Sequence, residues 1–330
     1  MSDKAPNVST AILHACSING DGSGAALEGK AISKVVQADA LGWVHLDGAH
    51  EDARGWLEDE LKFLDSIVVD ALLAEETRPR ILEFDGGALM ILRGVNLNED
   101  AAVEDMISLR IWIDAHRIIT VQRRPLRAVA DIHSRLMDGR GVKDSGEFIA
   151  ALAGRLFERM EPAFADLDEA LDDIEEKIME EPDPAERQAV VAIRKKTIIF
   201  RRYIAPQRDV ISYLRTSEAK WLRAHHRRSL QEVLDRIVRY IEDLDTIRER
   251  AQIVKDELAN GLADRMNKNM YVLSVIAAIF LPLGFLTGLL GINVGGIPGA
   301  NYGGSFIIFC VMLIAVVAAQ VYIFRKLKWF

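Results

Sequence analysis

The sequence of 330 residues has only two cysteines, no net positive charge and no recognisable leader sequence at its start. Cys16 falls in a predicted strand and Cys310 in a long apolar run, so we expect no disulfide between them, and reduced thiols suit a cytoplasmic body. The first residues, MSDKAPNVST, have no apolar core and no cleavage site, and we expect no signal peptide. The net charge of −8 argues against binding to nucleic acid, which requires a basic surface.

Enzyme and metal-site motifs are also missing. The glycine-rich stretch GDGSG at 20–24 is not followed by Lys and Ser or Thr, which favours a hairpin turn over a phosphate-binding loop. The histidines lack the spacing of a zinc site, and the adjacent His225 and His226 are expected to point to different sides of a helix. No paired carboxylates or nucleophile elbow stand out in the polar part. We therefore predict that the protein is not an enzyme and has no cofactor.

Charge is missing altogether from two runs near the C-terminus. Residues 271–290, YVLSVIAAIFLPLGFLTGLL, are twenty uncharged residues, and residues 306–324, FIIFCVMLIAVVAAQVYIF, are nineteen more. At about 1.5 Å per residue each run covers roughly 30 Å, the thickness of the hydrocarbon core of a bilayer. A soluble core helix of this length would need a polar face, which neither run has. We predict two transmembrane helices, at 270–290 and 306–324, joined by an uncharged loop at 291–305.

Basic residues flank the outer ends of these two runs. Arg265 and Lys268 precede the first run, and Arg325, Lys326 and Lys328 follow the second, whereas the loop between them contains no Lys or Arg. The positive-inside rule therefore places both chain ends in the cytoplasm and the loop outside. Because two helices cannot enclose a pore, the passage of ions would require several copies, with about five first helices around one axis.

Residues at the end of the first run resemble a known family. Pro282, then Gly291-Ile292-Asn293, a second apolar run and the basic tail at 325–330 together resemble the CorA family of divalent-cation transporters. The family signature at this place is Gly-Met-Asn. Here the middle residue is Ile, and the loop reads GGIPG where magnesium-transporting members usually carry an acidic MPEL-type stretch. These departures are similar to the ZntB-like zinc-transport branch.

The resemblance covers the whole chain and implies partners and a location. It implies a homopentamer in the lipid bilayer of a bacterial inner membrane, with Zn²⁺ as the transported ion. Cd²⁺, Ni²⁺ and Co²⁺ are further cations that the resemblance implies.

The first 125 residues alternate between strand and helix signals. Strands are predicted at 8–18 and 43–47, followed by two hairpins that turn at 85–87 and 114–116. Helices are predicted over about 51–63 and 66–75. The fold class is therefore α+β, with a mixed sheet and flanking helices in a cytoplasmic domain at 1–125. The family resemblance implies an α/β/α arrangement for this domain.

Strand signals stop after Pro125, and residues 126–222 are predicted to form a cytoplasmic helical region. Helices are expected over about 126–137, 146–180 and 185–214. The second is acidic in its later part and the third is basic, so we expect these two helices to pair; concentration of cations by the acidic residues is the alternative. The residues concerned are Asp166, Asp168, Asp172, Asp173, Glu175 and Glu176, with Arg194, Lys195, Lys196, Arg201 and Arg202.

Apolar residues at spacings of three and four predict a long stalk helix at 223–269 that continues into the first membrane run. The stripe consists of Leu230, Leu234, Ile237, Ile241, Leu244, Ile247, Ala251, Val254, Leu258 and Leu262. No proline interrupts it before Pro282, and Gly261 alone costs only about 1 kcal/mol. The helix would exceed about sixty residues and reach roughly 95 Å.

Continuing the same spacing into the membrane gives a face of mostly small or polar residues. These residues are Asn267, Met270, Ser274, Ala277, Leu281, Gly284 and Gly288. Such a face either allows close helix packing or lines a pore, and the family resemblance implies the pore. Further into the cytoplasm, Asp256 on this face would form a ring of carboxylates that attracts cations, with a solvated stalk charge as the alternative.

Asn293 is the predicted selectivity residue. Its amide oxygen and nearby carbonyls can hydrogen-bond the water shell of a divalent ion without removing that shell. Because neither run nor the loop contains Asp, Glu or His, we expect a ring of Gly291-Ile292-Asn293 to select a hydrated cation. Two other functions remain open, a magnesium or cobalt transporter of the CorA type and a membrane-anchored coiled-coil sensor.

Overall fold

The structure is a computed structural model that describes residues 10–291, 297, 299 and 301–326. It divides into two compact units, which are described separately. One contains Met1–Glu181 and Ala185–Lys255, and the other contains Pro182–Pro184 and Asp256–Phe330.

The first unit contains a seven-stranded mixed sheet with the order β2-β1-β3-β7-β6-β5-β4. The strands are β1 (Ile12–Ile18), β2 (Gly24–Ala26), β3 (Gly42–Asp47), β4 (Arg80–Phe84), β5 (Gly87–Gly94), β6 (Ile107–Asp114) and β7 (Arg117–Gln122). Strands β3 and β7 pair in parallel, whereas β4, β5, β6 and β7 form an antiparallel meander. The turn between β4 and β5 includes Gly86 with a φ of 86°, a conformation that favours glycine. The predicted mixed sheet and its two hairpins are confirmed.

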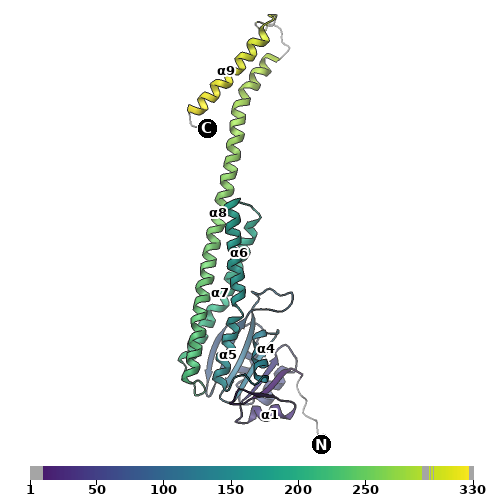
Figure 1. Cartoon of the computed structure of the whole chain (residues 1–330). Coiled ribbons are helices and arrows are strands. Elements are labelled where there is room, and N and C mark those ends of the chain that lie inside the picture. The colour runs from purple at the N-terminus through teal and green to yellow at the C-terminus, as the bar shows by residue number, and fades with distance from the viewer. Residues whose placement is uncertain (1–9, 292–296, 298, 300, 327–330) are drawn as a thin grey trace. The chain divides into compact units, whose positions relative to one another are not determined.

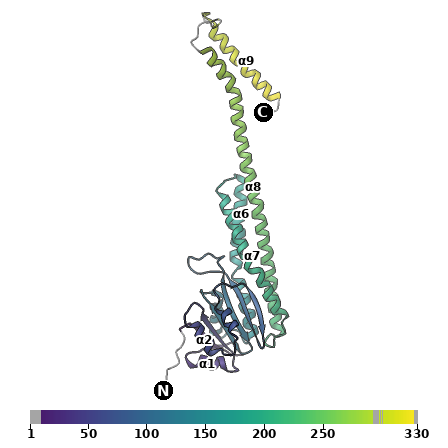
Figure 2. The ribbon, with the colours of Figure 1, turned by 180° about the vertical axis from the view of Figure 1, so that it is seen from behind.

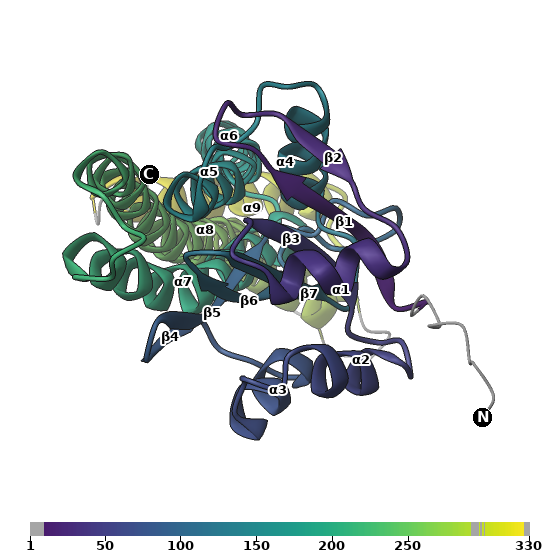
Figure 3. The same cartoon turned by 90° about the horizontal axis from the view of Figure 1, so that it is seen from below.

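Helices cover both faces of the sheet (Figure 3). One face is covered by α1 (Lys30–Gln37), α2 (Ala53–Glu60) and α3 (Ser66–Leu73), and the other by α4 (Arg127–Met137) and α5 (Ser145–Glu158). The core on the first face joins side chains of these three helices to the inward residues of β3, such as Val44 and Leu46. Sequence reasoning missed α1 because it is short and buries only Ile32 and Val36.

Residues 145–180 form two helices, so the prediction of one helix over 146–180 was wrong. Helix α5 ends at Glu158, and α6 (Glu161–Glu180) begins after a short break with Pro162 in its first turn. Proline has no N–H to donate to the preceding turn, and its ring collides with the carbonyl four residues back, so a helix ends more readily before it. Helix α7 (Glu186–Thr216) follows.

Helix α8 (Ala224–Gly291) is continuous over 68 residues and contributes to both units (Figures 1 and 2). Its length is about 100 Å at the standard helical rise. Helix α9 (Ser305–Lys326) follows it. Each of these two helices contains an apolar window long enough to cross a membrane, and very little of either window is buried. The predicted long helix and the two apolar C-terminal helices are confirmed.

Within the first unit, α8 buries a regular repeat of positions three and four residues apart. The buried residues are Leu230, Val233, Ile237, Tyr240, Leu244, Ile247, Ala251 and Val254. Two members of the predicted stripe, Leu234 and Ile241, are only half-buried, and Val233 and Tyr240 take their places. Tyr240 is buried because its ring packs edge-on against Phe164 of α6, with centroids 5.1 Å apart.

Candidate functional site

The predicted pore residues lie on one exposed face of α8 in the second unit. All seven, from Asn267 to Gly288, are exposed in the single chain. The two large apolar members, Met270 and Leu281, are 57% and 73% exposed. The side of α8 that packs against α9 carries other residues, of which Val275 is buried and Ala278 half-buried. The predicted face is therefore not covered by α9.

Two residues of the proposed filter lie outside the described residues. Gly291 is the last residue of α8, whereas Ile292 and Asn293 are not described. The selectivity motif therefore stays a prediction. Asp256 is among the described residues and is exposed. It precedes Met270 by two heptads on α8, and this spacing places it on the same face of the helix as the predicted pore residues.

Ser274 presents a hydrogen-bond acceptor on this face. Its hydroxyl donates to the carbonyl oxygen of Met270, at 2.8 Å, within the same helix. A serine oxygen that has donated its single proton still has lone pairs that can accept. The water molecules around a cation point their hydrogens outward, so an exposed acceptor of this kind suits a hydrated ion.

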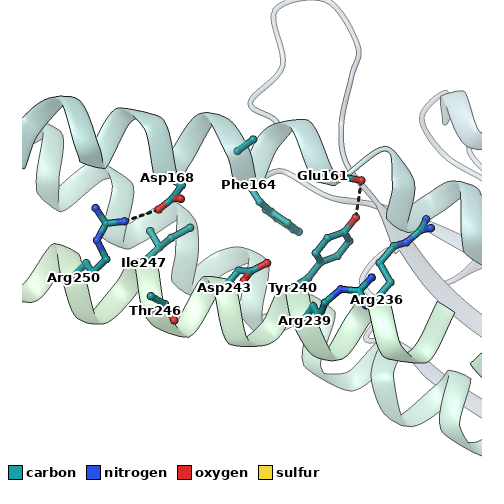
Figure 4. A pocket seen from close by; sticks show the side chains of 11 residues that line it. Glu161, Phe164, Asp168, Arg236, Arg239, Tyr240, Asp243, Thr246, Ile247 and Arg250 are labelled. Carbon is teal, nitrogen blue, oxygen red and sulfur yellow. Dashed lines mark hydrogen bonds and ion pairs between the residues drawn. The ribbon is translucent and has the colours of Figure 1, made fainter. Parts of the chain in front are cut away.

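A groove of about 520 Å³ lies between α6 and α8 in the first unit (Figure 4). At one end of it the Arg250 guanidinium binds three carboxylates of the acidic helix. The distances are 2.7 Å to Asp168 and 2.7 Å to Glu175, and Asp172 is the third partner. Hydrogen bonds to Glu175 and Asp172 raise the pKa of Arg250. Three carboxylates of the acidic helix thus share a single arginine of α8.

The acidic helix α6 and the basic helix α7 pack together, but the contact between them is apolar. Helices α6 and α7 contact each other across an apolar surface that includes Phe164 and Phe200, with ring centroids 5.2 Å apart. The basic residue Arg201 of α7 pairs with Asp245 of α8 at 2.6 Å. Lys196 of α7 pairs with Glu104, at 3.9 Å. The expected pairing of α6 with α7 is therefore confirmed, but these charged residues of the two helices have their partners on other elements.

Asp243 also lines this groove, on the opposite side from α6. Burial raises the pKa of its carboxyl, and the nearby charges of Asp168 and Glu242 raise it further. At the other end of the groove Tyr240 donates a hydrogen bond to Glu161, at 3.3 Å (Figure 4). The contacts of the groove therefore join α6 to the stalk helix, and we assign it that structural role.

Three histidines form a cluster that sequence reasoning missed. His14 on β1 and His45 on β3 are direct register partners, with ring centroids 4.7 Å apart, and the ring of His133 on α4 lies 4.2 Å from that of His14. Burial is the main cause that lowers the pKa of His14 to about 3 and that of His45 to about 4. The cluster is therefore neutral at neutral pH.

A second cluster joins Asp144, His225 and His226, whose ligand atoms all lie within 4.8 Å of one another. The two histidine rings have centroids 3.9 Å apart, so the prediction that they point to different sides was wrong. Both lie in the first turn of α8, where His226 turns back: its Nδ1 accepts a hydrogen bond from the backbone N–H of Arg223, at 3.1 Å.

The bond from Arg223 decides the chemistry of this cluster. A neutral imidazole that accepts at Nδ1 carries its proton on Nε2. That nitrogen lies 3.0 Å from Oδ1 of Asp144, which in turn accepts from the backbone N–H of Glu147, at 2.9 Å. Since neither nitrogen of His226 keeps a free lone pair, the residues fit a structural link between the starts of α5 and α8 and do not fit a metal site.

In the second unit, the turn at Pro182–Pro184 packs on α8 at Gly261. A Cβ on Gly261 would lie 2.7 Å from Cγ of Pro182, closer than such atoms approach. Nη1 of Arg265 lies 3.5 Å from the carbonyl oxygen of Pro182. Glycine is thus required at 261 by the close approach of the turn.

Comparison with known proteins identifies the family. Residues 38–326 match the family described as "CorA-like Mg2+ transporter protein". The chain belongs to the CorA family. CorA-family proteins are transporters rather than enzymes, so the protein is a membrane transporter of divalent cations, and its two apolar helices are the membrane spans.

Several relatives match the chain over nearly its full length. The divalent cation transporter CmaX of Pseudomonas aeruginosa is 36% identical over 322 residues, which are 96% of this chain and 96% of the relative. The zinc transport protein ZntB of Yersinia enterocolitica is 34% identical over 309 residues, 92% of this chain and 94% of the relative.

Solved structures show the same fold. The structure of full-length CmaX matches with a TM-score of 0.84 at 36% identity, over 97% of this chain and 98% of that one. The complete CorA magnesium transporter of Methanocaldococcus jannaschii matches with a TM-score of 0.80 over 96% and 98% of the two chains; its 19% identity shows the fold alone. The CorA fold therefore extends along the whole chain.

Proposed function

We propose that the protein carries Zn²⁺ across a bacterial inner membrane through a homopentameric pore lined by α8. The observation that carries this proposal is the exposed face of mostly small and polar residues on the apolar part of α8, which no element among the described residues covers. A helix that faced only lipid would have no reason to present Asn267, Ser274 and glycines along one side.

The choice of zinc rests on the relatives and on the filter. Several relatives that cover most of the chain are described as zinc transport proteins, and Ile292 and the GGIPG loop depart from the pattern of magnesium-transporting members. The second candidate is magnesium or cobalt, which the description of the family favours. A pore that selects a hydrated ion discriminates weakly between these cations, so the metal must be measured.

The proposed mechanism keeps the water shell on the ion. Asp256 and its copies attract the cation electrostatically, the acceptor oxygens of Asn267, Ser274 and Asn293 hydrogen-bond the shell, and Met270 and Leu281 narrow the pore. A divalent cation that enters down a potential of 100 mV gains about 4.6 kcal/mol, which supports uptake with both chain ends in the cytoplasm. The two runs contain no Asp, Glu, His, Lys or Arg, so any proton coupling would use water in the pore or cytoplasmic groups.

The test is zinc flux into liposomes that contain the purified protein and an internal zinc-sensitive dye. Asn293→Ala is compared with Asn301→Ala, a matched change in the same loop. We expect zinc influx in the wild type that Asn293→Ala loses and Asn301→Ala keeps. Faster influx with an acidic exterior would add proton coupling, and influx of magnesium with little zinc would assign the second candidate. No flux of either ion, from folded oligomeric protein, would contradict transport and leave the membrane-anchored sensor.

A further inference from the structure

Pro282 leaves one carbonyl group of α8 without its helical partner. In an α-helix the carbonyl of residue 278 accepts from the N–H of residue 282, and proline has no N–H. Ala278 lies in the membrane run, where no bulk water can satisfy the carbonyl, and an unpaired backbone group there costs several kcal/mol. Another donor must therefore reach Ala278.

Gln320 of α9 supplies that donor. Its Nε2 lies 3.2 Å from the carbonyl oxygen of Ala278. Gln320 is the one amide side chain in the second run, where a polar group is costly unless it has a partner. Its Oε1 is buried and has no hydrogen-bond partner among the residues that the structure describes. The amide is thus oriented for its donor, because the opposite orientation would place two oxygens against each other.

Two side-chain hydroxyls of the first membrane run make a different kind of hydrogen bond. Ser274 donates to Met270, and Thr287 donates to Leu283, both within α8. Neither contact joins the two membrane helices. The hydrogen bond from Gln320 joins α9 to α8, and its acceptor is the Ala278 carbonyl that Pro282 leaves without a helical partner.

We propose that Gln320 is a positioning residue that fixes α9 against α8 at the proline and thereby sets the pore wall. Ala278 and Pro282 lie on the α9 side of α8, next in sequence to Ala277 and Leu281 on the exposed face. Proline removes a backbone bond and allows α8 to bend there, and the amide holds the bend in one position. The effect on transport rests on the proposed function, whereas the link between the two helices does not.

The experiment is a double-mutant cycle in the full-length protein, with Gln320→Leu, Pro282→Ala and the two combined. Alanine at 282 restores the N–H that Ala278 lost, so the Gln320 bond is no longer needed. Each variant is scored by the rate of zinc influx into liposomes and by its thermal unfolding midpoint in detergent. Thr287→Val, which removes a bond within one helix, is the matched control.

We expect Gln320→Leu to slow zinc influx about threefold to twentyfold and to lower the unfolding midpoint, as for an interhelical hydrogen bond in a membrane. In the Pro282→Ala background the same change should alter the rate less than about twofold. Equal losses in the two backgrounds, or no loss in the first, would overturn the proposal. Absence of zinc flux in the wild type would contradict the proposed function. The double-mutant cycle would then be evaluated from the unfolding midpoints alone, which test the hydrogen bond between the two helices without reference to transport.

Discussion

Acidification should destabilise the cytoplasmic sheet through its buried histidines. His45 is 1% exposed, and its Nδ1 lies 2.7 Å from Oγ1 of Thr120, to which Nε1 of Trp43 donates at 2.8 Å. Burial lowers the pKa of His45 from 6.5 to about 4. The unfolded chain therefore binds a proton more readily than the folded one, and stability that is fully present above pH 6.5 is lost as the pH falls toward 4.

The size of the effect follows from these two pKa values. Between about pH 8 and about pH 5, the linkage relation gives a loss of about 2 kcal/mol in the free energy of unfolding from His45 alone. His14, whose pKa burial also lowers, adds a loss in the same direction. This is a large fraction of the stability of an ordinary domain, which is about 5–15 kcal/mol.

The assay is urea unfolding of the full chain in detergent, followed by tryptophan fluorescence at both pH values. Comparison of the wild type with His45→Asn isolates the contribution of the His45 titration. The cavity that the smaller side chain leaves lowers the free energy of unfolding equally at both pH values. His45→Asn should lose about 2 kcal/mol less than the wild type on acidification. The exposed His225→Asn is the control and should follow the wild type. Equal losses in the wild type and His45→Asn would refute the reasoning.

Two further predictions concern the stalk helix. Arg250→Ala should lower the free energy of unfolding by about 1–3 kcal/mol, because it leaves the carboxylates of α6 without their shared partner. The loss should shrink in high salt, which screens the ion pairs, and urea unfolding at two salt concentrations measures the loss and its salt dependence. Gly261→Ala should lower the thermal unfolding midpoint because its Cβ collides with Pro182, whereas Gly55→Ala, in open space on α2, should raise it by removing a glycine that costs about 1 kcal/mol. A higher midpoint for Gly261→Ala would contradict the contact with the turn.

The membrane helices could be predicted from the sequence because the bilayer imposes a local rule. Twenty apolar residues are visible without any knowledge of the fold, and the repeat of α8 is equally local. Three members of the predicted stripe, Leu234, Ile241 and Leu262, are only half-buried, and Val233 and Tyr240 are buried beside the first two. Tyr240 is buried in preference to Ile241 because its ring has an aromatic partner, Phe164, on another helix, which no local pattern contains.

The contacts between distant residues could not be predicted. His14 and His45 meet because β1 and β3 pair antiparallel in one register, and His133 joins them from a helix more than 80 residues further along the chain. Gln320 and Pro282 were both visible in the sequence, but the bond to Ala278 depends on how the two membrane helices align. The break before Pro162 was the exception, since its local signal was present and was overlooked.

The most direct test of the pore wall is cysteine modification along α8 during zinc flux, in a protein that carries Cys310→Ala. Ser274→Cys and Ala277→Cys lie on the proposed pore face, whereas Val272→Cys and Ile276→Cys are on other sides although these residues are also exposed in the single chain. A charged, membrane-impermeant thiol reagent should block zinc influx in the first pair and leave the second pair unaffected. Block at the second pair instead, or no block at any position, would contradict a cation pathway along this face.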